Sequence, residues 1–110
     1  MYSDDWLRQG FVTEERKKLS GSVYYRHTYD KNGVLVGVTV DFEYADDYHY
    51  ELLAKDWLAF CDQFLEKGKD EYLAFKEFLE REDLESIEGK FAFEDALTRR
   101  QIKFKKMAFY

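Results

Sequence analysis

Residues 23–44 read VYYRHTYDKNGVLVGVTVDFEY, and this stretch decides the fold. From Val34 onward, valines and then Phe42 and Tyr44 recur at every second residue, a period typical of a strand with one buried face. Asn32-Gly33 separates this run from a second β-rich run, and Asn-Gly in such a place is a strong signal for a β-hairpin. The sequence therefore predicts an antiparallel hairpin over about residues 19–44.

The register of this hairpin depends on the length of its loop. A two-residue loop at Asn32-Gly33 gathers the apolar side chains on one face, whereas a three-residue loop with a bulge at Gly33 shifts the pairing by one residue. We choose the first, which pairs Tyr29 with Val36, His27 with Val38, Tyr25 with Val40 and Val23 with Phe42. The other face is then expected to be exposed, and it carries Ser22, Tyr24, Arg26, Thr39, Asp41 and Glu43.

Two or three helices are expected to pack against the valine face. Apolar residues at three- and four-residue steps from Tyr50 to Leu65 predict a helix over about residues 47–67, with Asp46 or Asp47 as its cap. Asp70 caps a second predicted helix over about 70–88, and a third follows over about 93–100. Residues 102–109 alternate as a strand does, and a third strand there would stabilise the hairpin, although a helix fits part of 90–110 as well. Residues 1–18 fit a short helix or a loose arm. The prediction is a single α+β domain over residues 1–110.

Composition limits the classes of protein to which the chain can belong. It has 110 residues, a formal net charge of −6 and 45% hydrophobic residues, which fits neither a disordered tail nor a membrane protein. A single cysteine excludes an internal disulfide, and with only two histidines an ordinary zinc cluster is excluded as well. The first residues lack a signal-peptide pattern, so we expect a cytoplasmic protein, in the host cytoplasm if a phage encodes it, with no cofactor and no metal.

The side chains that could carry chemistry have plainer explanations. His27 falls on the predicted buried strand face, and His49 falls in the first turn of the predicted 47–67 helix beside capping carboxylates. Cys61 lies in the apolar stripe of that helix, where a buried and inert thiol is expected. No nucleophile elbow, phosphate loop or zinc-protease motif occurs, so we expect a protein that is not an enzyme.

Charge is segregated along the chain. Residues 51–89 carry 12 acidic and 5 basic side chains, whereas residues 90–110 carry 2 acidic and 6 basic ones. Either the charges of the two blocks neutralise each other across the fold, or both blocks simply face solvent. The alternative is that the acidic block binds a basic partner, with its negative charges spaced like the phosphates of a nucleic acid. Aromatic residues make up 19% of the chain, including nine tyrosines, more than a core of this size can hide, and tyrosine is typical of binding patches.

In size, acidity and aromatic content, though in no motif, the chain resembles the small inhibitors that phages encode against bacterial defence nucleases, including anti-CRISPR and anti-restriction proteins. The resemblance implies a non-enzymatic inhibitor that binds a basic, nucleic-acid-handling protein. A toxin-neutralising immunity protein and a generic adaptor or oligomerisation domain, including a homodimer, stay open as alternatives. A small enzyme and a single-strand nucleic-acid binder acting through the basic C-terminal tail rank below these.

The expected contact surface combines aromatic rings with carboxylates, a pairing that arginine-rich surfaces engage through cation–π stacking and bidentate hydrogen bonds. Its residues are Tyr24, Arg26, Asp41, Glu43, Asp46, Asp47 and Tyr48. A second acidic strip, ranked lower, comprises Glu71, Glu77, Glu80 and Glu85.

Overall fold

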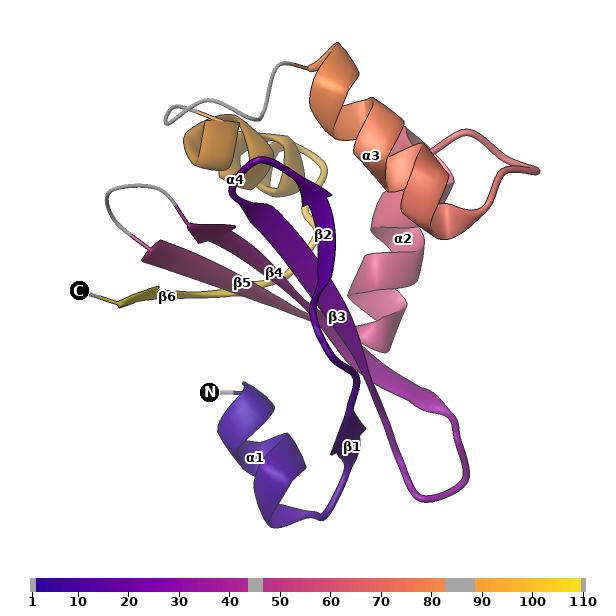
Figure 1. The fold of residues 1–110 in the computed structure, drawn as a ribbon, viewed down its shortest axis with the longest axis vertical. Coiled ribbons are helices and arrows are strands. Elements are labelled where there is room, and N and C mark those ends of the chain that lie inside the picture. The colour runs from indigo at the N-terminus through magenta and orange to yellow at the C-terminus, as the bar shows by residue number, and fades with distance from the viewer. Residues whose placement is uncertain (1, 44–46, 83–88, 110) are drawn as a thin grey trace.

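The predicted hairpin lies at the centre of the fold in a computed structural model, which describes residues 2–43, 47–82 and 89–109 (Figure 1). Strand β3 (Val23–Tyr29) pairs with β4 (Leu35–Glu43), and β5 (Asp47–Leu53) and then β6 (Lys105–Phe109) extend the sheet on the β4 side. The short strands β1 (Val12–Thr13) and β2 (Lys17–Ser20) both pair with the other edge of β3. All of these pairings are antiparallel.

Three helices cover one face of this sheet and a fourth lies apart from them. Figure 1 shows α2 (Ala54–Phe64), α3 (Glu71–Arg81) and α4 (Gly89–Arg99) grouped together, with α1 (Tyr2–Arg8) at the opposite end of the molecule. Valine, phenylalanine and tyrosine side chains of β3, β4 and β5 meet aromatic side chains of α2–α4 in one buried cluster. The α+β class is therefore confirmed. In the described ranges no helix has the length and apolar character needed to cross a membrane.

The hairpin register is confirmed over most of its length, but the predicted loop is wrong. Gly33 has a φ of 79° and ends a three-residue loop in which the Asp30 amide donates to the Val34 carbonyl. The Asp30 carboxylate also accepts from two backbone amides of the loop, which stabilises this wider turn. Tyr29 therefore pairs with Leu35 instead of Val36. A bulge at Val36 then restores the predicted pairs from His27–Val38 to Val23–Phe42.

The helix predicted over 47–67 is wrong in its first third, where the chain forms β5. Alternate residues of this segment, Tyr50 and Leu52, are fully buried on the helix-covered face. Their pattern fits a period of two as well as a helical spacing, and β4 needs a partner on its second edge. Asp47 is consequently a strand residue, Asp46 lies outside the described residues, and α2 begins only at Ala54.

The remaining elements agree with the predictions more closely. The Asp70 side chain accepts from the Leu73 amide at 3.3 Å and caps α3, whose predicted continuation over 83–88 lies outside the described residues. Helix α4 and strand β6 match the predicted segments 93–100 and 102–109, although β6 pairs with β5 instead of the hairpin. Of the two alternatives for the N-terminus, the helix is present, while β1 and β2 were not predicted.

The face predicted to be exposed is largely covered. Thr39 is 2% exposed and Asp41 is 1% exposed, both on the face away from α2–α4. The Trp6 ring of α1 lies against Gly37 on this face, and the Arg16 side chain crosses it from the segment between β1 and β2. Because α1 and this segment precede the hairpin in the chain, no pattern within the hairpin itself could reveal that they return to cover it.

Candidate functional site

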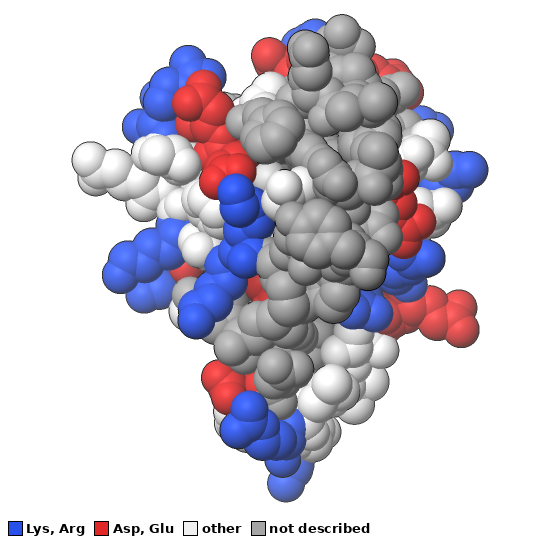
Figure 2. Space-filling view, turned by 90° about the vertical axis from the view of Figure 1, so that its left-hand side faces the viewer, with Lys and Arg blue, Asp and Glu red and all other residues white. Residues whose placement is uncertain are grey.

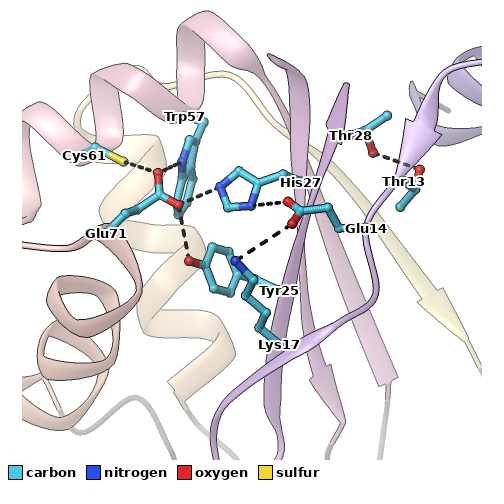
Figure 3. A network of polar contacts seen from close by, with 9 residues as sticks. All are labelled: Thr13, Glu14, Lys17, Tyr25, His27, Thr28, Trp57, Cys61 and Glu71. Carbon is cyan, nitrogen blue, oxygen red and sulfur yellow. Dashed lines mark hydrogen bonds and ion pairs between the residues drawn. The ribbon is translucent and has the colours of Figure 1, made fainter. Parts of the chain in front are cut away.

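The most extensive polar network of the described residues centres on the Glu71 carboxylate, at the start of α3 (Figure 3). It accepts hydrogen bonds from the Trp57 indole at 2.9 Å and from the Tyr25 hydroxyl at 3.2 Å. The Cys61 thiol lies 3.9 Å from the same carboxylate, and the His27 Nε2 lies 2.6 Å from it. One carboxylate thus joins β3, α2 and α3.

His27 lies between two carboxylates. Its Nδ1 is 3.1 Å from Glu14 Oε1, and Glu14 also lies 3.9 Å from the Lys17 ammonium group. The predicted role of His27 as a buried, partnered histidine is confirmed, and its side chain is only 9% exposed.

The network shifts the pKa values of three of its members, Glu71, Cys61 and Tyr25. Burial alone would raise the pKa of Glu71, but hydrogen bonds from His27 and Trp57 outweigh it and lower that pKa below its usual value. Burial, together with the Glu71 charge, raises the pKa of the Cys61 thiol to about 12 and raises the pKa of Tyr25 as well. A protonated thiol is a poor nucleophile, so this raised pKa disfavours Cys61 as a nucleophile at neutral pH.

The predicted contact residues of the hairpin do come together, but around an arginine of the same chain. The Arg16 guanidinium lies 4.4 Å from the centre of the Tyr24 ring, forms an ion pair with Glu43, and lies 3.7 Å from Asp41. The His49 Nδ1 approaches the Asp41 carboxylate at 2.7 Å from β5. The chemistry expected of an arginine-rich partner is therefore satisfied within the chain, and buried Asp41 cannot contact another protein.

The other predicted contact residues are placed as follows. Arg26 is half-buried on β3, next to Tyr24, and Tyr48 is half-buried on the opposite face of the sheet, where the Lys106 ammonium lies 5.5 Å from its ring centre. Asp47 contributes its backbone to β5, and Asp46 lies outside the described residues. Tyr48 therefore does not share a surface with Tyr24 and Arg26, because alternate residues of a sheet face opposite sides.

The second acidic strip is only partly exposed. Glu77 and Glu80 are exposed on α3, whereas Glu71 is committed to the network above and Glu85 lies outside the described residues. Exposed carboxylates also occur nearby at Asp62, Glu66 and Glu82. Over residues 54–82, eight acidic side chains stand against five basic ones. Asp56 is buried and Glu71 is half-buried, so six acidic side chains are exposed there beside the exposed Lys55, Lys67, Lys69 and Arg81. The outward side of α2 and α3 therefore carries a small excess of negative charge.

Two basic side chains of the C-terminal segment, Lys106 and Arg99, form internal ion pairs. Lys106 lies 3.1 Å from the Glu94 carboxylate, and Arg99 lies 2.9 Å from Asp95. Figure 2, which views the side of the molecule toward which β6 runs, shows basic side chains lying next to acidic ones. Neighbouring carboxylates oppose the approach of phosphates to Lys106 and Arg99.

Sequence reasoning missed Glu14, which contacts His27 in the Glu71 network, and Arg16, which contacts Asp41 and Glu43 on the other face of the sheet. It placed Trp57 in the core but did not predict the hydrogen bond from its indole to Glu71. The run Glu14-Glu15-Arg16-Lys17-Lys18 shows only charge, and nothing local indicates which side chains face the sheet.

Among the described residues no group of His, Cys, Asp and Glu side chains could hold a metal ion. Comparison with protein-family models, with curated proteins and with solved structures found no match for this chain.

Proposed function

We propose that this chain is a non-enzymatic binding protein whose partner is a protein with a basic surface. The observation that carries the proposal is the acidic outward side of α2 and α3, where Asp62, Glu66, Glu77, Glu80 and Glu82 are all exposed. Carboxylates gathered on one side of a protein accelerate association with a basic partner and select against acidic ones.

The state of the reactive side chains supports a role without catalysis. Among the described residues, each histidine lies against at least one carboxylate, and the Cys61 thiol is protonated and lies against Glu71. A thiol whose pKa is raised by burial is a poor nucleophile, so Cys61 gives no support to a catalytic role.

Nucleic-acid-handling proteins are the partners that fit this surface best, because their phosphate-binding surfaces are rich in Lys and Arg. An acidic helical surface can occupy such a site and exclude the nucleic acid. The proposal therefore includes inhibition of the partner, as in the phage-encoded anti-defence proteins that the chain resembles in size and charge. The outward side of α2 and α3 replaces the hairpin as the proposed contact surface, because Asp41 is buried and Glu43 is half-buried beneath Arg16. The carboxylates of α2 and α3 are exposed even where they pair with Lys67, Lys69 or Arg81.

Capture from a bacterial lysate tests this function when two charge variants are compared. The first variant combines Glu66→Gln, Glu77→Gln and Glu80→Gln. The control combines Asp5→Asn, Glu15→Gln and Asp95→Asn, which removes three exposed carboxylates elsewhere, so both change the net charge from −6 to −3. We expect the parent and the control to capture the same basic proteins, and the first variant to lose them. Equal capture by all three proteins contradicts the proposal.

A further inference from the structure

A shallow groove lies on the acidic side of the molecule, between α2 and α3 and beside the loop that joins them. Its volume is about 360 Å³, and its apolar lining comes from Leu58, Cys61, Leu65 and Ala74. Cys61 on α2 and Glu71 on α3 both line this groove, and Figure 3 shows that their side chains face each other. The volume falls within the range of sites that bind small ligands or a few protein side chains.

Two leucines of α2 and α3 are exposed, and one of them, Leu58, lines this groove. Leu58, which lines the groove, is 59% exposed, and Leu73, next to Ala74 on α3, is 51% exposed. Most large apolar side chains of the described residues lie in the core instead. An exposed apolar side chain in a groove with a charged rim is typical of a surface that binds a partner.

The rim of the groove is acidic. Asp62, Glu66 and Glu71 line it together with Lys67 and Lys69. Both lysines are already neutralised, since Lys67 lies 3.2 Å from Asp62 and Lys69 lies 3.1 Å from Glu66. Lys69 is held further by Glu77, 2.6 Å away, which raises the pKa of this ammonium group. Glu71 is committed to the network described above, so with Glu77 counted the rim offers three carboxylates against two ammonium groups.

We propose that this groove is where the basic partner docks, and that the occupant is a segment with one apolar side chain flanked by Arg or Lys. This inference rests on the proposed function and assigns its contact site. The apolar side chain lies on Leu58, Leu65 and Ala74, while the flanking cations pair with Asp62 and Glu66 and displace the exposed ammonium groups of the rim. An acidic segment would be repelled by the rim, as would the acidic side of a second copy of this chain.

Three synthetic peptides of equal length provide the probe. The first has a leucine flanked by arginines, the second has the same leucine flanked by glutamates, and the third has serine in place of the leucine between arginines. Binding is followed by the amide resonances of isotope-labelled protein. We expect the first peptide to shift resonances of residues 58–74, and each of the other two to bind at least about fivefold more weakly. Shifts confined to other regions, no binding by the first peptide, or equal binding by all three overturn the groove assignment.

Matched variants separate this assignment from the proposed function. Leu58→Ser removes the exposed apolar wall of the groove, and Leu7→Ser removes an equally exposed leucine of α1, 67% exposed, as its control. We expect Leu58→Ser to weaken binding of the first peptide at least about fivefold and Leu7→Ser to leave it unchanged. If Leu58→Ser keeps both peptide affinity and the salt-sensitive capture of basic proteins, the groove is wrong while the function stands. If the parent itself captures no basic protein, the function fails.

Discussion

Replacing Glu71 with alanine should destabilise the fold far more than its position on a surface helix indicates. The Trp57 and Tyr25 side chains are 0% and 1% exposed, and both donate to this carboxylate. A buried donor left without an acceptor costs about 1–3 kcal/mol. Since the Glu71 side chain is 34% exposed, water can reach part of the vacated space. We therefore expect Glu71→Ala to lower the free energy of unfolding by about 2–4 kcal/mol.

Urea unfolding followed by tryptophan fluorescence measures this loss. Glu80→Ala is the control, because Glu80 is an exposed glutamate of the same helix, and its change should stay within about 0.5 kcal/mol. Glu71→Gln should give an intermediate loss, since the amide keeps one acceptor oxygen but points a donor at other donors. A loss below about 1 kcal/mol for Glu71→Ala, or one equal to that of the control, would refute the argument that this carboxylate satisfies buried donors.

Three further predictions concern acid, packing and thiol chemistry. Contacts in the folded protein lower the pKa of Glu71, so the ionised carboxylate stabilises the fold fully at pH values above its unfolded pKa, near 4.3, and this stabilisation is lost as pH falls through the folded pKa. The urea midpoint of unfolding should therefore fall more steeply in acid for the parent than for Glu71→Gln. Parallel curves of urea midpoint against pH would refute this. Gly37→Ala places a methyl group 2.5 Å from the Leu52 carbonyl oxygen and the Trp6 ring, so thermal unfolding should report a loss of about 1–3 kcal/mol, and an unchanged melting temperature would contradict the close packing of α1. With a pKa of about 12, the Cys61 thiol should react with a disulfide reagent at neutral pH much more slowly in the folded protein than in urea, and equal rates would be evidence against its burial.

The hairpin shows how far local pattern determines this fold. The alternation through Val38, Val40 and Phe42 is enough to predict which residues pair, because a slip of one residue would expose the apolar face. The loop was predicted wrongly because the Asp30 carboxylate favours a wider turn, a preference that the Asn-Gly signal does not include. A bulge compensates for the longer loop, so the register survives an incorrect turn.

Residues 47–53 show the opposite case. Apolar side chains there fit a helical spacing and a strand period equally, and the choice is made by β4, which offers an unpaired edge. The site was harder still, because its contacts join distant segments: 44 residues separate His27 from Glu71, and 27 separate Arg16 from Glu43. The sequence did predict that an arginine would stack on a tyrosine and pair with the carboxylates of this surface. It could not reveal that this arginine, Arg16, belongs to the same chain.

The central claim, that an acidic surface on α2 and α3 binds a basic protein, is tested most directly by the salt dependence of the affinity for a purified partner captured as above. Calorimetry at about 50 mM and about 500 mM salt spans the range over which exposed charges become screened. The account predicts that the dissociation constant rises at least about tenfold over this range, and that the variant carrying Glu66→Gln, Glu77→Gln and Glu80→Gln loses most of this dependence. A dissociation constant that stays constant with salt would contradict it.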